Sequence, residues 1–258
     1  MISVAIITLN EEKQIKACLD SVSWADEIVV VDAESQDNTV QICRQFTDKI
    51  YIRKWAGFAE QKQFALDQCS HEWVLSLDAD ERVSDELREE IARLIRQHDT
   101  ADGYLIARRT YFLNKWIRHC GWYPGYQLRL FKREKTRVSQ TRVHEGFLVD
   151  GRVEKLDNDI IHFSYESLTQ SLEKLNRYTS LEALDRMEQK RVYWYDFLFR
   201  AFSTFWIKFV AQKGFLDGMH GFLLSWVSTL FKMVLYMKIW HLQRLSPEEV
   251  KAIKEATL

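Results

Sequence analysis

The sequence lacks the features that mark several specialised classes of protein. It contains only two prolines and four cysteines, and the cysteines are far apart, with no Cys-x-x-Cys pair. This spacing argues against a zinc site or a disulfide framework and suits a reducing cytosol. The formal net charge is -1, so the overall charge does not indicate a nucleic-acid partner. No internal repeat and no low-complexity segment is present.

Signals for a dinucleotide site, a P-loop, secretion and a membrane span are also missing. No Gly-x-Gly-x-x-Gly or Walker pattern follows the first predicted strand. No basic region precedes that strand, so we expect no signal peptide. Neither of the two apolar runs after residue 190 reaches about 18 residues without a charge, which does not favour a transmembrane helix. The composition, with 47% hydrophobic and 28% charged residues, is that of a globular protein.

The first 80 residues alternate between β-rich runs and helical patterns. Apolar runs predict strands at 3–8, 27–31, 50–53 and 73–77, and helical patterns lie between them at 11–22, 39–46 and 60–68. Such alternation predicts an α/β fold with a parallel sheet and right-handed crossovers.

Acidic residues follow two of the predicted strands. Asp78 and Asp80 come directly after the strand at 73–77, and Asp32 follows the strand at 27–31. In an open α/β sheet, ligands bind outside the carboxyl ends of the strands. Asp78 and Asp80 are spaced to bind one hard cation, Mg²⁺ or Mn²⁺, together with substrate phosphates. The alternative for so short a pattern is a solvated loop that leads into a helix.

Four motifs together resemble the family 2 glycosyltransferases. They are ITLNEE at 7–12, ADEIVVVD at 25–32, QKxxA at 61–65 and LDADE at 77–81. The resemblance covers roughly residues 1–165 and implies the GT-A fold, in which one nucleotide-binding α/β sheet is followed by an acceptor region. The order and spacing of the four motifs together are specific, although each motif alone is weak evidence.

The resemblance also implies roles for individual residues. Those expected around the nucleotide of a nucleotide-sugar donor are Thr8, Asn10, Glu11 and Asp32. Lys62 would lie near the base or diphosphate, Asp78 would face the ribose or a divalent metal, and Asp80 would bind that metal. Simpler interpretations remain open for Glu11, as an acid in the first turn of a helix, and for Lys62, as a solvated helical residue.

A second candidate centre is the RVHEG segment at 142–146. In an inverting transfer, a positioned Asp, Glu or His takes the proton of the acceptor hydroxyl while its oxygen attacks the anomeric carbon. The resemblance places this group at Glu145, and His144 either orients it or is structural. His162 follows in a predicted strand and is a candidate third metal ligand, as in some GT-A enzymes.

The segment between these centres is aromatic and then basic. Residues 111–126 are rich in Trp and Tyr, which stack on sugar rings or fill cores. A basic run follows, with positive side chains at Arg129, Lys132, Arg133, Lys135, Arg137 and Arg142. We expect this run to be a solvated surface; the functional alternative is contact with an anionic acceptor or with membrane head groups.

The C-terminal third is predicted to be helical. A long helix at 168–190 is followed by two aromatic-rich helices at 197–210 and 219–240. Between residues 187 and 244, eight Lys and Arg stand against three acids, which suits helices that lie in a membrane interface. A helical subdomain or a dimer face is the alternative. We therefore expect a catalytic domain over 1–165 and a membrane-interfacial helical region over 166–258.

Over its whole length, including YPGYQLRLFKR at 123–133, the sequence resembles bacterial lipopolysaccharide inner-core β-glucosyltransferases. This implies a metal-dependent inverting enzyme that transfers glucose from UDP-glucose to a lipid-linked glycan acceptor. We expect it in the cytoplasm, peripherally bound to the inner face of the cell membrane. Alternatives are a polyprenyl-phosphate or peptide acceptor, or a non-catalytic sugar-binding or scaffold protein. A sugar nucleotidyltransferase would need a Gly-rich basic loop, which residues 8–12 lack.

Overall fold

A computed structural model describes residues 1–97, 99–139, 146–165, 167–189 and 191–257. These residues form two compact units. The first consists of Met1–Thr110 and Pro124–Phe163, and the second of Tyr111–Tyr123 and Ser164–Leu258. The aromatic segment 111–123 thus belongs to the helical unit, whereas the sequence predicted a single division after residue 165.

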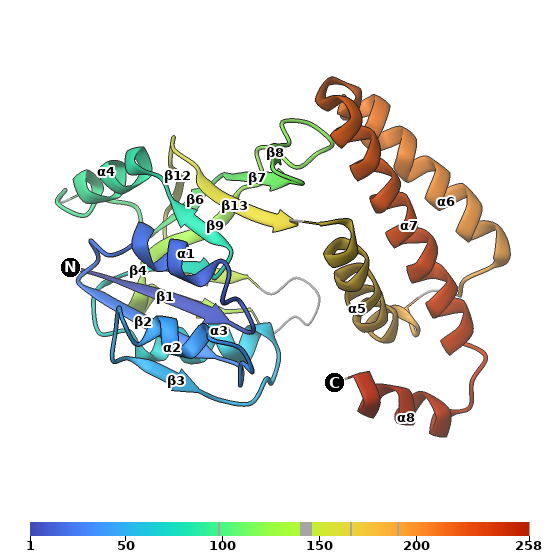
Figure 1. Ribbon diagram of the computed structural model, residues 1–258, viewed down its shortest axis with the longest axis horizontal. Helices are drawn as coiled ribbons and strands as arrows, with labels where there is room; N and C mark the ends of the chain where they lie inside the picture. The colour runs from blue at the N-terminus through green and yellow to red at the C-terminus, as the bar shows by residue number, and fades with distance from the viewer. Residues whose placement is uncertain (98, 140–145, 166, 190, 258) are drawn as a thin grey trace. The chain divides into compact units, whose positions relative to one another are not determined.

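A mixed, mostly parallel sheet organises the first unit (Figure 1). Its order is β12-β6-β9-β4-β1-β2-β3, with bounds β1 Ile2–Thr8, β2 Glu27–Asp32, β3 Ile50–Ile52, β4 Trp73–Asp78, β6 Gly103–Ile106, β9 Gln127–Lys132 and β12 Val153–Lys155. Strand β1 pairs in parallel with both β2 and β4, and β9 runs antiparallel to β4 and β6. The predicted α/β fold and its first four strands are confirmed.

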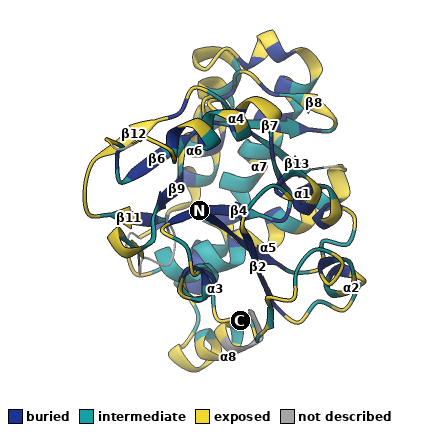
Figure 2. Ribbon diagram, turned by 90° about the vertical axis from the view of Figure 1, so that its left-hand side faces the viewer, coloured by how far each residue is buried: buried dark blue, intermediate teal, exposed yellow. Residues whose placement is uncertain are grey.

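Burial explains why the central strands are continuous apolar runs. Every residue of β1 and β2 is buried, as the dark blue of β2 in Figure 2 shows. Hydrophobic clusters cover both faces of the sheet. The helices of this unit are α1 Ile15–Ser21, α2 Thr39–Cys43, α3 Phe58–Gln68 and α4 Asp85–Leu94. Helix α1 begins later than predicted, and the backbone N–H groups of Glu11 and Glu12 before it donate to the side chains of Thr39 and Asp37.

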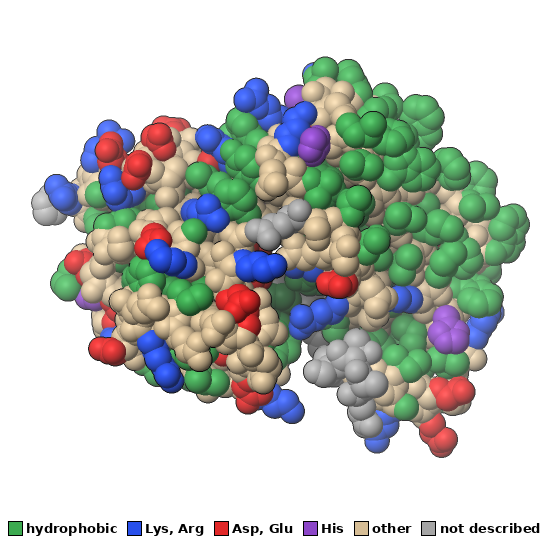
Figure 3. Space-filling view, viewed as in Figure 1, with side chains coloured by type: hydrophobic (Ala, Val, Ile, Leu, Met, Phe, Trp, Pro, Cys, Tyr) green, Lys and Arg blue, Asp and Glu red, His purple; other side chains and the backbone are tan. Residues whose placement is uncertain are grey.

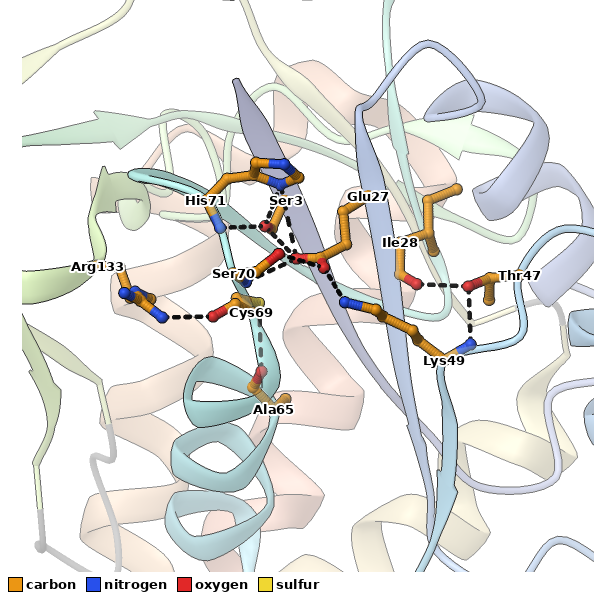
Figure 4. Close-up of polar contacts among 10 residues, drawn as sticks. All are labelled: Ser3, Glu27, Ile28, Thr47, Lys49, Ala65, Cys69, Ser70, His71 and Arg133. Atoms are coloured by element: carbon orange, nitrogen blue, oxygen red, sulfur yellow. Dashed lines mark hydrogen bonds and ion pairs between the residues drawn. The ribbon is translucent and has the colours of Figure 1, made fainter.

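At the amino edge of the sheet, the carboxylate of Glu27 joins three segments of the chain (Figure 4). It accepts hydrogen bonds from the hydroxyl of Ser3, from the ammonium of Lys49, and from the backbone N–H of Ser70 at 2.8 Å. Nδ1 of His71 lies 3.7 Å from the same carboxylate. Burial acts to raise the pKa of Glu27, but these donors outweigh it and lower the pKa to about 2.

A smaller sheet brings the acidic motif next to a downstream strand. Its order is β5-β13-β7-β8, with bounds β5 Glu81–Val83, β13 Ile160–Tyr165, β7 Arg108–Phe112 and β8 Lys115–Trp116. Strand β5 pairs antiparallel with β13, so that Glu81 lies opposite His162. The sequence did not predict β5, because three residues are too few to show alternation. A two-stranded ribbon pairs β10 Thr136–Val138 with β11 Phe147–Val149.

The second unit is built from helices. They are α5 Leu168–Arg186, α6 Trp194–Trp206, a π-helical turn at Ile207–Ala211, a 3₁₀ turn at Gly214–Asp217, α7 Gly218–Leu242 and α8 Pro247–Thr257. Helix α7 packs against both α5 and α6 (Figure 1). A Cβ on Gly221 would lie 1.9 Å from the carbonyl oxygen of Gly214, so the start of α7 needs glycine there to approach the preceding turn.

One helical segment of the described residues, Gly214–Leu242, is long and apolar enough to cross a membrane by length and composition alone. The sequence did not predict such a segment, because Lys232 and Lys238 interrupt the apolar run. Core helices of soluble proteins can have the same length and composition. Of the most apolar 18-residue stretch in this segment, however, only 28% is buried.

Candidate active site

The carboxyl ends of three adjacent strands meet at one edge of the sheet. In the register of the central strands, Thr8 of β1 lies opposite Asp32 of β2, and Ile7 lies opposite Asp78 of β4. The structure therefore brings Thr8, Asp32 and Asp78 to the same edge, as the sequence predicts, and this is the edge where α/β sheets bind ligands.

The loop after β1 is fixed to the loop after β2. The backbone N–H of Asn10 donates to the hydroxyl of Ser35 at 2.8 Å, and its Oδ1 accepts from the N–H of Gln36 at 2.8 Å. The N–H of Glu11 donates to Oγ1 of Thr39 at 2.8 Å. Asn10 has a φ of 53°, a left-handed conformation that asparagine tolerates. These bonds position Asn10 and Glu11 beside the strand ends.

Asp32 and Thr8 differ in how their polar atoms are satisfied. Asp32 is buried, and its two carboxylate oxygens accept from the N–H of Ser35 at 2.8 Å and from the Ser35 hydroxyl at 2.5 Å. The buried Thr8 hydroxyl and the buried Gln61 Oε1 have no hydrogen-bond partner within the described part of the chain. An unsatisfied buried polar group costs about 1–3 kcal/mol, so a partner for either atom would stabilise the protein.

A partly buried charge cluster lies at the end of β4, with the side chains of Arg129 and Glu81 buried and that of Asp78 30% exposed. One guanidinium nitrogen of Arg129 lies 2.5 Å from Oδ2 of Asp78 and 2.6 Å from Oε1 of Glu81. Arg108 approaches the same Glu81 oxygen at 3.7 Å, and Nζ of Lys62 lies 3.9 Å from Oδ1 of Asp78. The N–H of Asp78 donates to Glu81 at 2.9 Å. Lys62 thus lies beside Asp78, and its expected place near the base or diphosphate of the donor stays a prediction.

These contacts keep Asp78 and Arg129 ionised. Burial alone would raise the pKa of Asp78, but the guanidinium of Arg129 and the ammonium of Lys62 outweigh it and hold this pKa well below its usual range. Burial would likewise lower the pKa of Arg129, and the carboxylates of Asp78 and Glu81 raise it instead. Asp78 and Arg129 therefore both remain charged at neutral pH.

The expectation that Arg129 belongs to a solvated basic surface is wrong. Its side chain is 4% exposed, because β9 lies in the middle of the sheet between β4 and β6. Sequence reasoning missed Arg129 and Glu81 as members of the site. The available signal was the arginine between Leu128 and Leu130 in a predicted strand, since a charge flanked by apolar residues there needs a buried partner.

Asp80 and His162 form a separate pair. Nε2 of His162 lies 3.4 Å from Oδ2 of Asp80, and the backbone carbonyl of Asp80 accepts from the N–H of Phe163 at 3.0 Å. Nδ1 of His162 lies 3.3 Å from the hydroxyl of Thr110. This second contact orients the imidazole, as outer-shell groups do around metal-binding histidines.

The Asp80–His162 pair fits a divalent metal with two protein ligands. A carboxylate oxygen and an imidazole nitrogen are both donors for Mn²⁺, and Mg²⁺ uses one or two carboxylates together with substrate phosphates and water. The carboxylate of Asp78 contacts basic side chains instead of this pair, since Arg129 and Lys62 face its two oxygens. Within the described residues, no cluster of three or more His, Cys, Asp or Glu side chains is arranged to hold a metal ion.

Glu145 and His144 lie outside the described residues. The strands β10 and β11 end and begin at Val138 and Phe147, on either side of them. The role of Glu145 as general base therefore stays a prediction.

Residues 3–150 match the family model for glycosyl transferase family 2. The chain belongs to this family. It is 31% identical over 248 residues to the lipopolysaccharide core biosynthesis glycosyltransferase LpsC of Rhizobium meliloti, covering 93% of this chain and 92% of that protein. It is 30% identical over 264 residues to an uncharacterised glycosyltransferase of Rickettsia typhi, covering 95% of this chain and 87% of that protein.

Among solved structures, the chain is similar to that of residues 1–349 of S. aureus TarS in complex with UDP-GlcNAc. The TM-score is 0.46 and the identity 18%, with 98% of this chain and 83% of the TarS chain covered. Membership of family 2 identifies the mostly parallel sheet as the predicted GT-A fold, followed by C-terminal helices. The protein is a nucleotide-sugar glycosyltransferase.

Proposed function

We propose that the protein is a metal-dependent inverting hexosyltransferase that moves a sugar from a UDP-sugar to a hydroxyl of a lipid-linked glycan. The observation that carries this proposal is the pairing of Asp80 with His162 next to the ionised Asp78–Arg129 cluster. A pair of metal ligands beside fixed charges at the carboxyl edge of the sheet suits the transfer of a sugar from a nucleoside diphosphate.

Each part of the donor has matching groups in the chain. The unsatisfied Thr8 hydroxyl and Gln61 Oε1 are suited to the nucleoside, together with the loops that hold Asn10, Glu11 and Asp32. Lys62 supplies a positive charge for the diphosphate beside Asp78. A divalent metal held by Asp80 and His162 would neutralise the leaving diphosphate.

Glu145 is proposed to accept the proton of the acceptor hydroxyl. The oxygen of that hydroxyl forms the new bond to the anomeric carbon as the bond to the nucleoside diphosphate breaks, and the configuration inverts. Glu145→Gln should therefore abolish transfer while UDP binding stays at the wild-type level. Normal turnover by this variant would assign the base elsewhere.

Glucose as the transferred sugar and the lipopolysaccharide inner core as the acceptor rest on the sequence resemblance. The name of the relative LpsC, a lipopolysaccharide core biosynthesis enzyme, supports the acceptor class. We also propose that the protein works at the cytoplasmic face of the membrane. Its cysteines at 18, 43, 69 and 120 are all free and buried, which agrees with a reducing compartment.

A transfer assay tests the proposal. Purified protein is incubated with Mn²⁺ and radiolabelled UDP-glucose, UDP-galactose or UDP-GlcNAc, and with lipopolysaccharide truncated at the inner-core heptose or with a polyprenyl phosphate. We expect label in the truncated lipopolysaccharide, highest with UDP-glucose, and none with Asp80→Asn. Label in the polyprenyl phosphate alone would overturn the hydroxyl acceptor, and no transfer with any pair would overturn the proposal.

A further inference from the structure

Large apolar side chains lie exposed along α6 and through the turn into α7. Six of them, each between 57% and 73% exposed, define what we call the hairpin face: Trp194, Phe199, Phe202, Trp206, Leu216 and Met219. Figure 3 shows hydrophobic side chains gathered over this helical unit. An apolar surface of this extent on a soluble protein marks a contact with another molecule or with a membrane.

Helices α6 and α7 also contact each other through aromatic rings. Between α6 and α7, the ring of Phe205 lies 5.3 Å from that of Phe209 and 4.9 Å from that of Trp226, measured between centroids. Phe209 and Phe222 are 5.7 Å apart. These ring contacts join the two helices, and two of the rings, Phe222 and Trp226, are themselves exposed and enlarge the apolar surface.

Charges are distributed around this face in a way that suits an anionic lipid surface. Between residues 191 and 247 the acids are Asp196 and Asp217, and both are buried. Exposed cations stand at the base and the tip of the helix pair: Arg191 before α6, Lys213 in the turn and Arg244 after α7. Exposed aromatic residues with basic residues at the ends are typical of interfacial helices, and the nearest exposed acids, Glu188 and Glu248, lie just outside this stretch.

We propose that the hairpin face docks on an anionic lipid bilayer, with α6 and α7 lying in the interface rather than crossing it. Helix α7 has 25 residues, enough to span a bilayer, but its C-terminal half is bound to α5. Nζ of Lys238 donates to the carbonyl and to the side-chain oxygen of Asn176, both at 2.8 Å. Helix α5 exposes Glu173 and Arg177 nearby, and a spanning α7 would carry these charges into the hydrocarbon.

Docking would also hold the aromatic segment 111–123 near the lipid surface. Nζ of Lys115 donates to the backbone carbonyl of Asp217 at 2.8 Å, and the Asp217 carboxylate accepts from the N–H of His119 at 2.8 Å. Nζ of Lys208 donates to the carbonyl of Cys120 at 3.0 Å. This consequence rests on the proposed function, because it places a candidate acceptor segment beside lipid-linked glycans.

Vesicle flotation of the full chain tests the docking. The vesicles contain phosphatidylethanolamine and phosphatidylglycerol, or phosphatidylcholine alone. We expect binding that is at least about tenfold stronger to the anionic vesicles, and release of the bound protein by alkaline carbonate. Retention after carbonate treatment would overturn the interfacial position, and absence of binding to anionic vesicles would overturn the proposal.

Matched variants separate lipid contact from folding. The double variant Phe199→Ser/Trp206→Ser should lose about tenfold in vesicle binding with an unchanged Tm, since both side chains are exposed. Lys213→Glu should weaken binding to anionic vesicles. Val153→Ser replaces an exposed apolar residue of β12 and should change neither vesicle binding nor Tm. Wild-type flotation of the double variant would contradict the proposal.

Two outcomes distinguish the neighbouring hypotheses. If sedimentation shows a lipid-free dimer that the double variant dissociates, and vesicles do not bind, the hairpin face contacts a second copy and lipid docking is wrong. Failure of the proposed function would leave vesicle binding unchanged, because no residue of the hairpin face belongs to the candidate active site.

Discussion

The guanidinium of Arg129 lies 2.5 Å from the carboxylate of Asp78. This contact joins the middle of β9 to the end of β4, two strands that run antiparallel. The same nitrogen also bonds Glu81, which is fully buried. Arg129 is thus the shared cation of two carboxylates at the candidate active site, and we infer that it positions both.

Arg129→Met should destabilise the fold by about 3–5 kcal/mol, because it leaves Asp78 and Glu81 close together without their buried counter-charge. Urea unfolding measures this free energy. Arg137→Met is the matched control, since Arg137 is exposed in the same basic run, and should change the free energy by less than about 0.5 kcal/mol. Equal effects of the two variants would show that the Asp78–Arg129 contact is not structural.

Thr8→Val removes a buried hydroxyl that has no partner in the part of the chain that the structure describes. Without ligand, the variant should be as stable as the wild type or more so, because an apolar group of the same shape replaces an unsatisfied one. With UDP, it should lose about three- to tenfold in affinity, corresponding to about 0.5–1.5 kcal/mol for one hydrogen bond. Calorimetric titration and Tm give the two readouts, and a stability loss without an affinity loss would contradict a ligand role.

His162→Ala should reduce the strengthening of UDP binding by Mn²⁺ by about tenfold or more, since it removes one of two protein donors near the metal. Binding of UDP without metal should change little. His241→Ala is the control, because His241 is exposed on α7. An unchanged manganese effect in His162→Ala would remove His162 from the metal site.

Acid should destabilise the protein partly through Glu27. Its pKa is lowered to about 2 in the folded state, against about 4.3 unfolded, so its contribution is fully present above about pH 4.3 and is lost as pH falls towards 2. The shift corresponds to about 3 kcal/mol. In Glu27→Gln, unfolding free energy should therefore fall less steeply between about pH 4.5 and 2.5 than in the wild type. Parallel curves would contradict this role.

The sequence predicted which residues meet at the carboxyl edge of the sheet. Adjacent parallel strands end at the same edge, so the residues at their ends lie close together. Predicting that Thr8, Asp32 and Asp78 lie together required only the positions at which three strands end. The pairing of Asp80 with His162 depends instead on β5, whose three residues show no pattern of their own. Family resemblance suggested His162, and the strand pairing accounts for its place.

Arg129 illustrates what the sequence did not reveal. Its carboxylate partners lie 51 and 48 residues earlier in the chain. Because other basic residues follow it, the sequence pattern indicated an exposed basic run rather than a buried position in a strand. The sequence likewise placed segment 111–123 in the catalytic domain, whereas its bonds to Asp217 and Lys208 join residues 99 and 88 positions apart. Long-range polar contacts of this kind leave no local periodicity.

Thermal unfolding with nucleotide sugars tests the central claim most directly. The protein is heated with UDP-, GDP-, ADP- or dTDP-sugars, each with and without Mn²⁺, beside the Asp80→Asn variant. We predict that UDP-sugars selectively raise the Tm, that Mn²⁺ enlarges this rise, and that Asp80→Asn loses the manganese effect while keeping its ligand-free Tm. No shift with any nucleotide sugar, or an identical manganese effect in Asp80→Asn, would contradict a metal-assisted UDP-sugar site at this edge of the sheet.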